Sequence, residues 1–317
     1  MHGRRIAETA RICPVTTDSP APPLSPANWP AWLGIAFGWT LAHWPWGLVR
    51  RVAPALGRVM QLCMVARRRV ARSNLALCFP ELTQAQQREL LRAHFRSLGM
   101  AVFEFLRAWW GRLPPLDAGF VIEGLQYVER ARAEGRGVIL ISPHFTTLEI
   151  CNRLLCRYVP VAGMYRPHES PALDWAVMRG RMGHAAAMFA RDELRPAIRY
   201  LKSGGVLWFA PDQESRRGDS VFVPFFGQPA WSLTSTHQMA RLSGALVLPL
   251  FHERREDGRY HVEIGAPLRE FPGTDPLRDT ERVMALIEAQ IRRAPAQYLW
   301  IHKRFKTQPE GKPSPYQ

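Results

Sequence analysis

Short apolar runs alternate with helix-like segments from residue 121 onward. Five runs have the length and the residue types of buried strands, and they cover residues 137–142, 159–165, 185–190, 205–210 and 245–251. The segments that separate or follow them have the end signals or the apolar spacing of helices, at residues 125–134, 171–182, 193–203, 233–242 and 276–293. This alternation predicts an α/β fold with a mostly parallel central sheet flanked by helices.

A long amphipathic helix is expected before the sheet, over residues 81–110. Its apolar residues recur in alternating steps of four and three, so they lie on one face, which we assign to core packing. Thr83 followed by Gln86 fits a cap at its start, and Gly111 fits its end. At the other end of the chain, residues 297–300 read as a late strand.

The apolar run at 137–142 leads into a histidine, His144, and then a carboxylate, Glu149. On one continuous helix these side chains would lie about 140° apart around the axis. We therefore expect His144 on a loop and Glu149 in the first turn of the next helix, where Glu149 can orient His144 as a general base. A structural alternative stays open, because residues 146–149 also fit a capping box in which Glu149 only starts the helix.

Two further polar residues follow expected strands in the same way. Arg166 comes after the run at 159–165, and Asp212 comes after the run at 205–210. Ligands of open α/β sheets bind beyond the carboxyl ends of the strands. Base, cation and carboxylate are therefore expected at one edge of the sheet, although Arg166 could equally be a surface arginine and Asp212 a turn residue.

Charge and tryptophan content favour an anionic, interfacial partner. The chain has 42 Lys+Arg against 27 Asp+Glu, a net charge of +15, and eleven tryptophans. Residues 29–49 carry no charged side chain, and as a helix they would rise roughly 31 Å, about one hydrocarbon thickness. More arginines follow this segment than precede it, which places the rest of the chain in the cytoplasm. We expect one membrane helix here, with an in-plane amphipathic anchor as the alternative.

The ordered motifs resemble the lysophospholipid acyltransferase superfamily, and most closely the secondary (late) acyltransferases of bacterial lipid A biosynthesis. The resemblance covers about residues 29–310. It rests on the H-x4-E motif from His144 to Glu149, Tyr165-Arg166-Pro167, Asp174-Trp175, Arg179-Gly180-Arg181, Pro211-Asp212-Gln213, Ser220 to Gly227 and Gln297 to Lys306, with Arg72-Ser73-Asn74-Leu75 and Cys78-Phe79-Pro80 upstream.

The resemblance implies a glycerolipid acyltransferase-like fold in the bacterial inner membrane, with its catalytic domain facing the cytoplasm. It implies transfer of a fatty acyl chain from acyl carrier protein to a hydroxyl of a lipid A precursor, an acylated and phosphorylated glucosamine disaccharide. His144 would be the general base, Glu149 its orienter, and Arg166 and Asp212 substrate-binding residues. The thioester is already activated, so no cofactor is expected, and the five cysteines form no C-x2-C metal pair.

We divide the chain into a disordered leader (1–28), a membrane anchor with a basic juxtamembrane segment (29–72), an acyltransferase domain (73–307) and a tail (308–317). Two other functions stay open. The acceptor can be another glycolipid or a lysophospholipid. Alternatively, the protein is a non-catalytic basic protein that binds membrane or nucleic acid, although no nucleic-acid motif is visible and that partner is not expected.

Overall fold

A seven-stranded sheet with the strand order β1-β9-β8-β2-β5-β3-β4 forms the centre of the computed structural model, which describes residues 21–113, 120–214 and 218–316. Among these strands only β8 and β9 pair in antiparallel fashion. The mostly parallel α/β sheet predicted from the sequence is therefore confirmed. The strands are β1 (Phe120–Glu123), β2 (Val138–Ile141), β3 (Val161–Tyr165), β4 (Met188–Ala190), β5 (Val206–Phe209), β8 (Leu246–Arg254) and β9 (Tyr260–Ile264).

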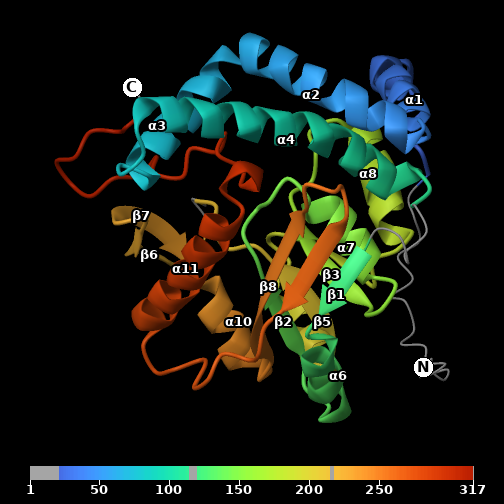
Figure 1. The fold of residues 1–317 in the computed structure, drawn as a ribbon. Coiled ribbons are helices and arrows are strands. Elements are labelled where there is room, and N and C mark those ends of the chain that lie inside the picture. Colours follow the sequence, from blue (N-terminus) through green and yellow to red (C-terminus); the bar gives the residue numbers. More distant parts are fainter. Residues whose placement is uncertain (1–20, 114–119, 215–217, 317) are drawn as a thin grey trace, which may run out of the picture.

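Helices pack around this sheet, and a separate hairpin of β6 (Ser220–Phe225) and β7 (Gln228–Leu233) lies beside α11 (Figure 1). The helices of the α/β part match the expected segments within two residues at each end. They are α6 (Leu125–Ala133), α8 (Pro171–Met182), α9 (Leu194–Lys202), α10 (Ser235–Ser243) and α11 (Pro276–Arg293), and a short helix α7 (Leu148–Leu155) follows β2.

The long helix α4 (Gln84–Trp110) begins with the predicted capping box between Thr83 and Gln86. It lies across the carboxyl ends of the strands, because Ser97 of α4 hydrogen-bonds Thr146 after β2, and Glu104 pairs with Arg254 at the end of β8. Part of its apolar stripe is buried in the core, as predicted. This helix therefore forms one wall of the region in which the strand-end residues lie.

The single helix expected over residues 29–49 is not formed. The chain instead makes α1 (Trp29–Ala42) and α2 (Trp46–Cys63), separated at Pro45, whose ring disfavours helical backbone in the preceding residue. None of the helices in the described ranges is both long enough and apolar enough to cross a bilayer. The predicted membrane helix is therefore replaced by two shorter helices that both contact α4 (Figure 1).

Residues 29–72, predicted as the membrane anchor and juxtamembrane segment, pack directly on α4 of the predicted acyltransferase domain. On α2 the buried residues Val49, Ala53 and Gly57 recur every four positions and face α4. The backbones touch here, since a Cβ atom on Gly99 would lie 2.2 Å from the Ala53 carbonyl oxygen. The predicted domain boundary at residue 72 falls inside α3 (Val65–Cys78), which itself contacts α4.

The two ends of the chain differ from the predictions. Residues 1–20 of the predicted leader lie outside the described residues, and the last part of that leader forms a 3-10 helix, Pro26–Asn28. The prediction of a late strand at 297–300 is wrong. A second 3-10 helix, Pro295–Gln297, is followed by one antiparallel bridge between Tyr298 and Phe145. In the tail, Tyr316 packs back on α3, where its hydroxyl donates to Asn74 Oδ1.

Candidate active site

His144 lies on the loop after β2, as predicted, and the C-terminal segment holds that loop in place. The Leu299 N–H donates to the His144 carbonyl oxygen at 3.0 Å, and the Thr146 N–H donates to the Gln297 carbonyl oxygen at 2.7 Å. Two backbone hydrogen bonds therefore fix the loop at the histidine and two residues after it. The imidazole is thus carried on a rigid turn at the carboxyl end of a central strand.

The carboxylate that contacts His144 is Asp212, which follows the neighbouring strand β5. His144 Nδ1 lies 2.7 Å from Asp212 Oδ1, and the His144 backbone N–H donates to Asp212 Oδ2 at 3.2 Å. Asp212 is fully buried, whereas the His144 side chain is 30% exposed. Burial alone would raise the pKa of Asp212, but the charge and hydrogen bonds of His144 outweigh it and lower that pKa.

This pairing determines what His144 can do. An ionised Asp212 accepts the Nδ1 proton, so Nε2 of the neutral imidazole carries the free lone pair. Nε2 can take a proton from a hydroxyl, and Asp212 then stabilises the resulting imidazolium. The Tyr298 hydroxyl also hydrogen-bonds Asp212, and burial raises the pKa of that phenol far above its usual value. The orienting carboxylate is therefore enclosed and bonded on several sides.

The pairing predicted between His144 and Glu149 is not formed. Trp109 Nε1–H donates to Glu149 Oε2 at 2.8 Å, and Arg181 forms an ion pair with the same carboxylate. Within the described residues Glu149 has no hydrogen bond to His144, because its side chain points from α7 toward α4 and α8. The capping-box alternative is not formed either, since Thr147 is the N-cap residue and makes no side-chain cap bond.

Arg166 does not join the site. It lies after β3, next to β5 in the sheet, but its side chain is exposed and makes no hydrogen bond or ion pair with any described residue. Arg181, in the last turn of α8, was not predicted as a site residue. Its ion pair with Glu149 is largely buried. The signal was present, because Arg181 belongs to the quoted Arg179-Gly180-Arg181 motif. Spacing alone did not show which arginine points inward.

No group of three or more His, Cys, Asp or Glu side chains in the described part of the chain could hold a metal ion. Two other histidines lie near the site, His252 fully buried and His302 partly buried. Burial lowers the pKa of His252 to about 3 and that of His302 to about 4. His252 Nδ1 lies 3.0 Å from Thr147 Oγ1, so it supports the start of α7. The partly exposed His144, paired with Asp212, is therefore the base that the geometry favours.

Comparison with known proteins identifies the family. The model of the bacterial lipid A biosynthesis acyltransferase family matches residues 22–307. The chain belongs to this family. The lipid A biosynthesis lauroyltransferase of Escherichia coli K12 is 36% identical over 298 residues, which cover 92% of this chain and 96% of that enzyme. The lipid A biosynthesis palmitoleoyltransferase of the same organism is 36% identical over 295 residues, with the same coverage.

A solved structure, that of the 1-acyl-sn-glycerophosphate acyltransferase PlsC from Thermotoga maritima, aligns with a TM-score of 0.35 and 16% identity over 79% of this chain and 97% of that one. The family resemblance stated from the motifs is confirmed by the family match and the two Escherichia coli relatives. The lipid A acyltransferase described here is thus an O-acyltransferase of lipid A biosynthesis, and the non-catalytic hypothesis is no longer favoured.

Proposed function

We propose that this lipid A acyltransferase moves a fatty acyl chain from an acyl carrier protein thioester to a hydroxyl of a lipid A precursor, with His144 as general base and Asp212 as its orienter. The observation that carries the proposal is the bond between Asp212 and His144 Nδ1, which leaves Nε2 free. Asp212 here takes the orienting role first given to Glu149. Glu149 remains a predicted site residue, and its ion pair with Arg181 holds its side chain in place.

The proposed reaction needs only one base. His144 Nε2 removes the proton of the acceptor hydroxyl as its oxygen attacks the thioester carbonyl carbon. The C–O bond forms, the C–S bond breaks, and the thiolate of the carrier leaves and takes the proton from the imidazolium. Because a thiolate is a good leaving group, the proposed reaction requires neither a covalent enzyme intermediate nor a cofactor.

The donor assignment is supported by charge. Acyl carrier proteins are acidic, and this chain has a net charge of +15, so electrostatic attraction favours their encounter. We expect purified enzyme to add one acyl group to a lipid A precursor, with a higher kcat/KM for acyl carrier protein than for a coenzyme A thioester. Mass spectrometry of the product identifies the added acyl group, and initial rates with each donor give the two kcat/KM values. Transfer to a lysophospholipid or another glycolipid, and none to the precursor, would favour the other acceptor.

We further propose that α1 and α2 lie in the surface of the bacterial inner membrane, with the catalytic part on its cytoplasmic side. Large apolar side chains are exposed on these helices, including Leu33 (74%) and Phe37 (65%). Exposed arginines follow on α2, at Arg50, Arg51 and Arg58. Apolar side chains beside cationic ones are typical of in-plane anchors that bind anionic lipid.

Replacing Leu33 and Phe37 with glutamate is expected to abolish cosedimentation with vesicles that contain anionic lipid. The reason is that both side chains would otherwise enter the acyl boundary of the bilayer. Leu242→Glu is a matched control, because Leu242 is equally apolar and 55% exposed but lies on α10. Vesicle binding that survives in the double variant, or that Leu242→Glu also abolishes, would contradict the proposed anchor.

A further inference from the structure

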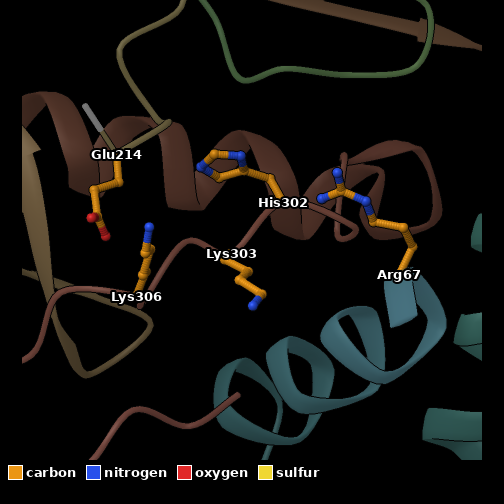
Figure 2. A pocket seen from close by; sticks show the side chains of 5 residues that line it. All are labelled: Arg67, Glu214, His302, Lys303 and Lys306. Atoms are coloured by element: carbon orange, nitrogen blue, oxygen red, sulfur yellow. The ribbon is translucent and has the colours of Figure 1, made fainter. Parts of the chain in front are cut away.

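A small pocket lies beside the His144–Asp212 pair, and no step of the proposed reaction uses it. Its volume is about 220 Å³, and it is lined by Arg67, Glu214, His302, Lys303 and Lys306. Figure 2 shows that these side chains come from three segments: α3, the loop after β5, and the C-terminal segment. Residues far apart in the chain therefore enclose one space.

The backbone connects this pocket to the base. The Leu299 N–H donates to the His144 carbonyl oxygen, and the His302 N–H donates to the Leu299 carbonyl oxygen at 3.2 Å. Glu214 follows Asp212 by two residues on the same loop. The charges of Asp212 and His144 both act on the pKa of His302, which also places the imidazole near them. A group bound in the pocket would thus lie next to the reacting hydroxyl.

The cationic side chains of the pocket are not neutralised. Within the described ranges Arg67 hydrogen-bonds only the Ile301 carbonyl oxygen, at 3.4 Å, and Lys303 Nζ lies 5.8 Å from the ring centroid of Tyr316. Neither of them, nor Lys306, forms an ion pair with a carboxylate of the described residues. Among the described residues that line the pocket, Glu214 is the one acidic group, and it faces three cationic side chains.

Glu214 is itself engaged elsewhere. Its Oε2 accepts the Thr307 N–H at 2.9 Å, and its Oε1 accepts the Thr307 hydroxyl at 2.6 Å. His302 differs, since its Nε2 is buried and has no hydrogen-bond partner among the described residues. A neutral imidazole can donate one N–H to an anionic oxygen. The pocket therefore offers an excess of positive charge, and the His302 imidazole forms part of its lining.

We propose that this pocket binds a phosphate group of the lipid acceptor, an inference that rests on the proposed function. The pocket is smaller than the roughly 300–1,000 Å³ of sites for drug-sized ligands, so it fits one compact group and not a whole disaccharide. A phosphate has the oxygen acceptors and the charge that Arg and Lys bind best. Bound there, it would hold the neighbouring hydroxyl against His144 and select phosphorylated acceptors.

Two sets of variants test the proposal, each with a control that removes the same charge elsewhere. Lys303→Ala and Lys306→Ala, made singly, are each compared with Lys202→Ala on α9, and Arg67→Gln is compared with Arg69→Gln, an exposed arginine of the same helix. The KM for the phosphorylated acceptor should rise about tenfold or more in the pocket variants, because charge-assisted hydrogen bonds are lost. The controls and the donor KM should not change.

An acceptor from which the phosphates have been removed provides the second comparison. Wild type and pocket variants should acylate it equally slowly. A pocket variant with an unchanged KM for the phosphorylated acceptor would overturn the proposal. A rise confined to the donor KM would also overturn it, and would assign the pocket to the carrier side.

Inorganic phosphate separates this inference from the function on which it rests. It should raise the melting temperature of wild type, Lys202→Ala and Arg69→Gln but not of the pocket variants, since a ligand stabilises only a fold that binds it. Equal stabilisation of all variants would contradict the site. Phosphate binding that depends on the pocket, without acyl transfer to any lipid A precursor, would instead sink the proposed function and leave the anion site standing.

Discussion

His144→Ala is expected to reduce acyl transfer about 10²–10⁴-fold while the protein stays folded. Positioned general bases contribute rate factors of this size. The His144 side chain is partly exposed, and the hydrogen bonds that hold its loop come from the backbone. Circular dichroism should therefore show the wild-type fold, with a lower melting temperature because the buried Asp212 loses its imidazole partner, while turnover of acyl carrier protein thioester with a lipid A precursor falls. Undiminished turnover would rule out His144 as the base.

The partner assignment is tested by Asp212→Asn. The asparagine oxygen can still accept the His144 backbone N–H, but its NH₂ group can donate to Nδ1 and so favour the tautomer with a protonated Nε2. We expect kcat to fall nearly as far as in His144→Ala. Full activity in Asp212→Asn, together with an inactive but stable Glu149→Gln, would return the orienting role to Glu149.

Glu149→Ala is expected to lower the free energy of unfolding by about 3–5 kcal/mol. The substitution leaves the largely buried Arg181 without its carboxylate and the Trp109 N–H without its acceptor, and an unpaired buried charge costs about this much. Urea denaturation measures the loss. A surface control is Glu89→Ala, whose arginine partners are about half exposed, so its urea midpoint should stay close to that of wild type.

A double variant makes the reason for the loss testable. Glu149→Ala combined with Arg181→Met removes both charges, so much of the lost stability should return. If Glu149→Ala unfolds at the wild-type urea concentration but cannot transfer acyl groups, the ion pair has no structural role and Glu149 acts in the chemistry itself. The buried pair would then be part of the catalytic machinery.

Much of the sheet could be predicted because its central strands are buried on both faces and read as apolar runs. β2 and β5 are of this kind, and each was expected within two residues of its observed ends. The hairpin of β6 and β7 was missed as secondary structure. Its turn places Phe226 and Gly227 at positive φ, and the bulky Phe226 gives no turn signal. β1 and β9 are short and lie at one edge of the sheet, where periodicity is weak.

The sequence predicted at which edge of the sheet the site lies, but not which carboxylate contacts His144. Strand ends brought His144 and Asp212 to one edge, as expected from the parallel arrangement of β2 and β5. The near neighbour in sequence, Glu149, was chosen as partner, whereas the contacting carboxylate lies 68 residues away. A spacing rule can compare residues on one element but cannot measure a distance across two strands. For the same reason Arg166 was preferred to Arg181.

The hydrogen bonds from Gln297 and Leu299 to the His144 loop have a consequence for biosynthesis. Domains form from the N-terminal end as the ribosome extends the chain. The sheet residues through β9 are made before Gln297 and Leu299, the residues that fix the catalytic loop. The sheet can therefore begin to fold while the loop that carries His144 is still unfixed.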